Sequence, residues 1–102
     1  MVITPNLDEW NRQYIAFAQA LLGVISQNFR MVWLDYGDES WLMHFVLESD
    51  DKIDREEIDE AVTQFEALQD RAIACKADVV VDPGSLDWPS PPARVIFCRR
   101  EG

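Results

Sequence analysis

His44 is the only histidine among the 102 residues, and it stands in a strand-like stretch with carboxylates nearby in the sequence. Imidazole is the most common general base in enzymes, and a neighbouring carboxylate orients the ring. Asp35 and Glu48 are the candidates for that carboxylate. A single histidine on a half-exposed strand is more often a hydrogen-bonding surface residue. A small enzyme or ligand-binding module that uses the hairpin face around His44 is therefore the alternative function.

The sequence contains none of the common motifs for other chemistry. Its four glycines are isolated, which excludes the glycine-rich phosphate loops of nucleotide-binding proteins. Residues 49–57 are rich in carboxylates, but they lack the glycine and the alternating ligand pattern of a calcium loop. Cys75 and Cys98 do not stand at metal-ligand spacing from His44, and we interpret them as small, partly buried apolar residues. We expect no catalytic activity, no metal and no cofactor.

The negative charge of the chain is concentrated in one segment. Between Asp35 and Asp70 lie 13 of the 19 acidic residues, and only Lys52 and Arg55 oppose them, so this segment carries a net charge of −11. The whole chain carries −10. A concentrated negative surface repels nucleic acid and membranes and attracts cationic partners at long range. The charge distribution therefore favours a protein-binding function.

Two segments have the apolar periodicity of a helix. In residues 7–25, apolar side chains recur at steps of three and four, and Asn6 or Thr4 can cap the first turn. In the second segment, Asp54 and Glu57 have the spacing of a capping box, which predicts a helix with Asp54 as its N-cap. The apolar side of this second helix consists of Ile58, Val62, Phe65, Leu68 and Ala72. Its opposite side is acidic.

Four segments have the composition of β-strands. Residues 29–36 and 41–48 are rich in aromatic and β-branched side chains, and four turn-forming residues separate them, which is typical of a β-hairpin. Residues 77–81 and 94–99 are the other two strands. Residues 82–92, in the loop between them, include four prolines, which exclude regular structure. The predicted element order along the chain is α-β-β-α-β-β.

These elements predict an α+β fold, a two-layer sandwich in which a mostly antiparallel four-stranded sheet carries both helices on one face. The length allows a single domain over residues 1–102. With 48% hydrophobic residues the chain is too apolar for a disordered acidic tail. It shows no export signal and no window of 18 uninterrupted apolar residues, so we expect a cytoplasmic protein.

A longer pattern resembles a known group of bacterial proteins. It combines residues 21–32, the acidic start of the second helix at residues 54–57, the proline-rich loop and residues 95–101. This combination resembles bacterial toxin immunity proteins, namely those directed against contact-dependent growth inhibition toxins and MafI-like proteins directed against MafB-type toxins. The resemblance covers most of the chain. Its motifs are structural, so it assigns no active-site residues.

Such a family implies a cytoplasmic inhibitor that binds one cognate toxin domain, frequently a nuclease, and blocks its active site or its substrate path. A nuclease presents Lys and Arg to phosphates, so an acidic inhibitor gains association rate and selectivity against it. We therefore predict a non-enzymatic immunity protein with a basic toxin domain as its partner, and with neither nucleic acid nor a membrane as a partner.

The predicted contacts with the toxin are carboxylates of the hairpin turn and the acidic helix. They are Asp38, Glu39, Asp50, Asp51, Glu56, Asp59, Glu60, Glu66 and Asp70. Trp88, in the proline-rich loop, either anchors an interface or packs beneath the loop, and we favour packing. A further alternative function is a structural adaptor that self-associates through an exposed strand edge.

Overall fold

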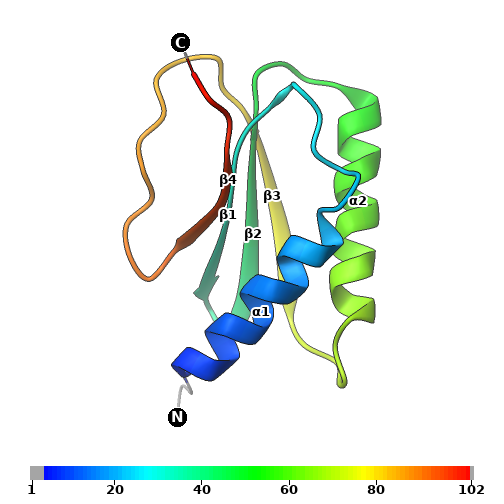
Figure 1. Ribbon diagram of the computed structural model, residues 1–102, viewed down its shortest axis with the longest axis vertical. Coiled ribbons are helices and arrows are strands. Elements are labelled where there is room, and N and C mark those ends of the chain that lie inside the picture. The colour runs from blue at the N-terminus through cyan, green and yellow to red at the C-terminus, as the bar shows by residue number, and fades with distance from the viewer. Residues whose placement is uncertain (1–3, 102) are drawn as a thin grey trace.

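A computed structural model describes residues 4–101 and shows an α+β protein with two helices and four strands (Figure 1). Along the chain these are α1 (Leu7–Ala20), β1 (Phe29–Gly37), β2 (Ser40–Leu47), α2 (Lys52–Ala67), β3 (Cys75–Val81) and β4 (Arg94–Cys98). Both helices lie on one face of the sheet. No helix among the described residues covers the opposite face, which we call the open face.

The sheet is mixed, and its strand order in space, β3-β2-β1-β4, differs from the order along the chain. β1 pairs antiparallel with β2 and with β4, whereas β2 and β3 run parallel. Parallel neighbours need a crossover connection, and the 16-residue helix α2 supplies it by returning the chain along the sheet. The expectation of a mostly antiparallel sheet is therefore wrong.

A two-residue turn joins β1 to β2. Its residues Asp38 and Glu39 have positive φ angles of 51° and 59°. A turn with two positive φ angles matches the twist of the flanking strands and fixes their register. In that register Trp33 lies opposite His44, and Leu34 lies opposite Met43. Because side chains alternate along a strand, Leu34 and Met43 belong to the core, and Trp33 and His44 belong to the open face.

Both helices differ from their predicted bounds: α1 ends earlier than predicted, and α2 begins earlier. Asn6 caps α1 as expected, but the helix ends at Ala20, and the chain turns away at Gly23, which has a φ of +81°. Helix α2 begins after Asp51, whose side chain accepts a hydrogen bond from the backbone N–H of Asp54. Asp51 and Asp54 have the same three-residue spacing as the predicted capping box. The assignment of Asp54 as the N-cap is therefore wrong.

Asp54 instead connects α2 to the segment before β1. Only 6% of Asp54 is exposed, and its carboxylate accepts hydrogen bonds from Ser26 Oγ and Asn28 Nδ2, each at 2.9 Å. Glu57, the other residue of the predicted capping box, is exposed. Of these two acidic residues, only Asp54 has a structural task.

The core lies between the helices and the sheet. Phe17 of α1 packs edge to face against Phe45 of β2 and Phe65 of α2, with ring centroids 5.8 Å and 6.0 Å apart. All three rings are fully buried. Burial of a phenylalanine side chain contributes about 1.5–3 kcal/mol. This aromatic cluster fixes α2 on the sheet and thereby determines which side of α2 faces solvent.

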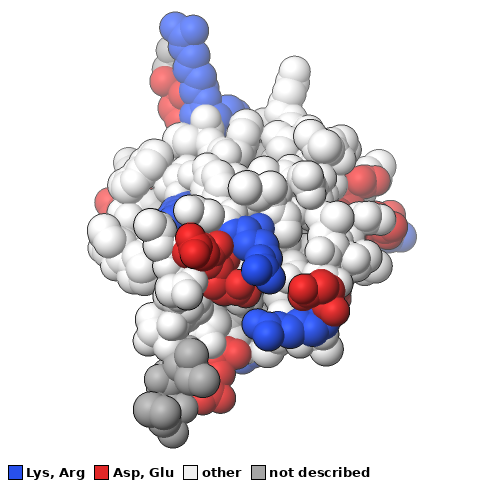
Figure 2. Space-filling view, turned by 60° about the horizontal axis from the view of Figure 1, so that its bottom comes forward, with Lys and Arg blue, Asp and Glu red and all other residues white. Residues whose placement is uncertain are grey.

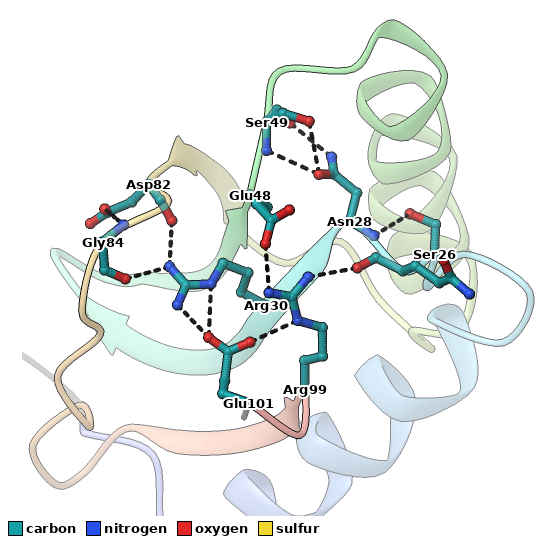
Figure 3. A network of polar contacts seen from close by, with 10 residues as sticks. Ser26, Asn28, Arg30, Glu48, Ser49, Asp82, Gly84, Arg99 and Glu101 are labelled. Carbon is teal, nitrogen blue, oxygen red and sulfur yellow. Dashed lines mark hydrogen bonds and ion pairs between the residues drawn. The ribbon is translucent and has the colours of Figure 1, made fainter.

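Two arginines hold the end of the sheet at which β2, β3 and β4 finish (Figure 3). Arg30 is buried, and its guanidinium donates to two carbonyl oxygens of the turn at residues 82–84, each at 2.6 Å, and to the Glu101 carboxylate. Arg99 donates to Glu101 at 2.7 Å and to Glu48 at 2.8 Å. Hydrogen bonds from Arg30 and Arg99 hold the pKa of Glu101 below its ordinary value. These contacts anchor the loop that follows β3.

Candidate partner-binding surface

Besides Glu57, helix α2 presents four exposed carboxylates, which we call the acidic row. They are Glu56, Asp59, Glu60 and Glu66. Among residues 4–101, only Glu56 of this row has a basic side chain within 4.0 Å, and that partner, Lys52, is itself 90% exposed. Such an exposed pair contributes at most about 1 kcal/mol. The acidic row therefore keeps its negative charge available to a partner.

Asp50 and Asp51 precede α2, and both carboxylates already have partners. Asp50 accepts a hydrogen bond from Arg55 Nε at 2.6 Å, and Asp51 caps the helix. Both residues are exposed, so a second protein can still reach them. The structure thus places these two predicted contacts beside the start of α2, where their first task is to stabilise the helix.

Asp38, Glu39 and Asp70 lie at the opposite end of the molecule from the start of α2 (Figure 1). Glu39 lines a shallow hollow together with Glu9 and Arg71. Figure 2 shows acidic and basic side chains side by side at this end of the molecule. Mixed charge attracts a cationic partner less strongly than a surface of one sign. The predicted carboxylates therefore do not form one continuous surface.

Trp88 lies in the loop between β3 and β4, and 67% of it is exposed. The interpretation that Trp88 packs beneath this loop is therefore wrong. Leu86, two residues earlier, is partly buried instead. The loop runs on the β4 side of the sheet, whereas α2 lies on the β3 side (Figure 1). Trp88 and the acidic row are consequently on different sides of the molecule.

On the open face of the sheet, His44 stacks on Trp33, with ring centroids 4.8 Å apart and an angle of 16° between the planes. Its Nδ1 lies 3.3 Å from a carboxylate oxygen of Asp78 in β3. The carboxylates predicted as partners of His44 have other hydrogen bonds: Asp35 accepts from the backbone N–H of Tyr36, and Glu48 accepts from Arg99 at the end of the sheet. Sequence reasoning missed Asp78 because only the parallel register of β3 places it opposite His44. His44 is a stacked, hydrogen-bonded side chain.

Metal-binding and membrane-spanning features are not found in the described residues. No group of three or more His, Cys, Asp and Glu side chains between residues 4 and 101 could hold a metal ion. No helix in the same range is long and apolar enough to cross a membrane. Cys75 and Cys98 are free thiols. Burial, and to a lesser extent the charge of Glu66, raises the pKa of Cys75, so little of it is the reactive thiolate near neutral pH.

The fold and its surfaces define a small α+β domain with exposed carboxylates along helix α2. The family model of the MafI2 immunity protein matches residues 11–101. The chain belongs to this family, which confirms the resemblance to MafI-like immunity proteins and supports an immunity function with a cognate toxin as partner. No curated protein matches the chain.

Proposed function

We propose that this protein binds a basic toxin domain through the acidic row of α2 and blocks it, acting in the cytoplasm without catalysing a reaction. A nuclease domain of a MafB-type or contact-dependent growth inhibition toxin has the required chemistry, because it presents lysine and arginine to phosphates. The observation that carries the proposal is the acidic row itself: exposed, largely unpaired carboxylates on a helix of an immunity protein.

The position of the acidic row suits fast association. An inhibitor must reach its toxin before the toxin reaches its substrate, and complementary charge raises the association rate more than the affinity. Because the aromatic core holds α2 rigidly, the row is presented in one orientation. A rigid charged surface loses little conformational entropy on binding, which favours a tight complex.

The proposal is tested by stopped-flow association with the catalytically inactivated domain of the cognate toxin, at several salt concentrations. The test variant is Asp59→Asn with Glu60→Gln, and the matched control is Asp38→Asn with Glu39→Gln, which removes the same charge from the hairpin turn. We expect the first pair to slow association by about tenfold at low salt and to flatten the salt dependence, and the control to change it by less than about twofold.

Equal effects of the two variants would show that only net charge matters, and would contradict an interface on α2. A larger effect of the Asp38 and Glu39 variant would move the interface to the hairpin turn. A wild-type chain that fails to bind the toxin domain would overturn the proposal as a whole.

A further inference from the structure

Strand β3 forms one edge of the sheet, and its outer backbone groups are open. Its hydrogen-bonded neighbour in the described sheet is β2 alone. The Ala74 carbonyl accepts from the Trp41 N–H, and the Asp82 N–H donates to the Leu47 carbonyl. In a parallel pair, alternate residues direct both backbone groups to the neighbouring strand. The even-numbered residues of β3 therefore direct their backbone N–H and C=O groups toward β2. The backbone groups that point away from the sheet are those of Cys75, Ala77, Val79 and Val81.

The other edge of the sheet is protected by its length, an irregularity and nearby prolines, whereas β3 has only the charged side chains Lys76 and Asp78 as protection. Strand β4 has only five residues, its register with β1 is shifted by an irregularity, and two consecutive prolines, Pro91 and Pro92, stand shortly before it. Short length, bulges and proline are the usual protections of an edge strand. β3 pairs with β2 over seven residues without a register shift and contains no proline. Exposed apolar side chains, Val80 and Val81, end this strand.

Two carboxylates of the acidic row, Asp59 and Glu66, lie on the side of α2 that is next to the β3 edge. Glu66 is close enough to Cys75, the first residue of β3, for its charge to raise the pKa of that thiol. Asp59 precedes Glu66 by seven residues, so it lies two helical turns away on the same side of α2. Figure 1 shows α2 beside β3 on the outer side of the sheet. A strand added to β3 would therefore lie next to these carboxylates.

We propose that the toxin docks by adding an extended strand that carries lysine or arginine to the β3 edge, with its basic side chains directed at Asp59 and Glu66. This inference rests on the proposed function and specifies how the toxin is held. Backbone hydrogen bonds supply the affinity in such strand addition, and the side chains beside the strand supply the selectivity. Self-association of two copies through β3 would place two strongly acidic chains together, since each carries −10.

Amide hydrogen exchange measured by NMR tests the strand addition residue by residue. In the free protein, we expect fast exchange at the N–H groups of Ala77 and Val79 and slow exchange at those of Asp78 and Val80. Binding of the inactivated toxin domain should slow Ala77 and Val79 by about a hundredfold or more, because each gains a hydrogen bond. Unchanged exchange at both, with protection confined to α2, would overturn the inference while leaving the proposed function intact. Protection confined to α1 or to the loop at residues 82–93 would contradict both.

A proline on the edge provides the second test. Ala77→Pro removes a backbone N–H that points away from the sheet and makes no hydrogen bond to β2. Edge strands tolerate proline at such positions. The matched control, Ala77→Ser, keeps that N–H. We expect Ala77→Pro to weaken toxin binding by about tenfold or more with near-native thermal stability, and Ala77→Ser to bind like the wild type. Equal affinity of the two variants, or a change only in self-association measured by sedimentation, would contradict toxin docking at β3.

Discussion

The side-chain amides of Gln13 and Gln69 exchange two hydrogen bonds across the interface between the helices. Gln13 Nε2 donates to Gln69 Oε1 at 2.8 Å, and Gln69 Nε2 donates to Gln13 Oε1 at 2.7 Å. Gln13 is 1% exposed, and it also donates to Glu9 at 3.0 Å. A buried amide is tolerated only when its groups are paired, so this reciprocal contact fastens the chain after α2 to the middle of α1.

Replacing Gln13 by alanine should therefore destabilise the fold. The substitution leaves the partly buried Gln69 amide without its partner on α1, which costs about 1–3 kcal/mol. Urea denaturation measures the free energy of unfolding, and Gln19→Ala is the control because Gln19 is exposed on the same helix. A loss smaller than that of Gln19→Ala would mean that water replaces the missing partner.

Asp54 should matter for folding, and its neighbour Glu57 should not. Asp54→Ala removes the acceptor for Ser26 and Asn28, and we expect a loss of about 1–3 kcal/mol in the free energy of unfolding. Glu57→Ala removes the same charge from an exposed position, and we expect a change within about 0.5 kcal/mol. Similar losses in the free energy of unfolding for both variants would contradict this assignment and support the predicted capping box.

Acid should weaken the contact between Glu101 and the two arginines. The folded-state pKa of Glu101 lies below its ordinary value of 4.5, with Arg30 as the main cause and Arg99 as the second. The ionised carboxylate therefore stabilises the fold above that ordinary value, and the contribution disappears as the pH falls through the lower folded pKa. Glu101→Gln should reduce the midpoint urea concentration at pH 7 and have a smaller effect as the pH falls below 4.5. A pH-independent difference would contradict this account.

The two thiols should react at different rates. Cys98 is exposed, whereas burial and the charge of Glu66 raise the pKa of Cys75. Because the thiolate is the nucleophile, a maleimide should label Cys98 first at neutral pH. Glu66→Gln removes the negative charge that disfavours the Cys75 thiolate, so it should speed the labelling of Cys75. Mass spectrometry of tryptic peptides measures the labelling of each thiol. Equal labelling rates in the wild-type protein would be inconsistent with the burial of Cys75.

The elements could be predicted because local patterns determine them. The period of apolar residues located both helices, and the polar turn between two aromatic strands located the hairpin. The direction of β3 was not read from its own residues, although the 16-residue helix before it is about 24 Å long and can return the chain to the start of β2. A helix of that length between two strands favours a parallel pair.

The candidate site was only partly predictable, because contacts between distant segments decide which carboxylates are free. Asp51 and Asp54 are both acidic residues at the start of a helix, and only the approach of Ser26 and Asn28 distinguishes the buried one. Asp78 likewise meets His44 only through the sheet register. The outward carboxylates of α2 followed directly from the helical period, so that part of the surface could be predicted.

Trp88 gives the protein an optical reporter. Of the four tryptophans, Trp10 and Trp41 are 6% and 4% exposed and pack edge to face, and Trp33 is partly covered by His44. Acrylamide should therefore quench the fluorescence of Trp88 first. Its loop lies on the β4 side, away from α2, so binding at the acidic row and the β3 edge should leave that quenching unchanged. Steady-state emission can thus show, without any label, which side of the molecule a partner covers.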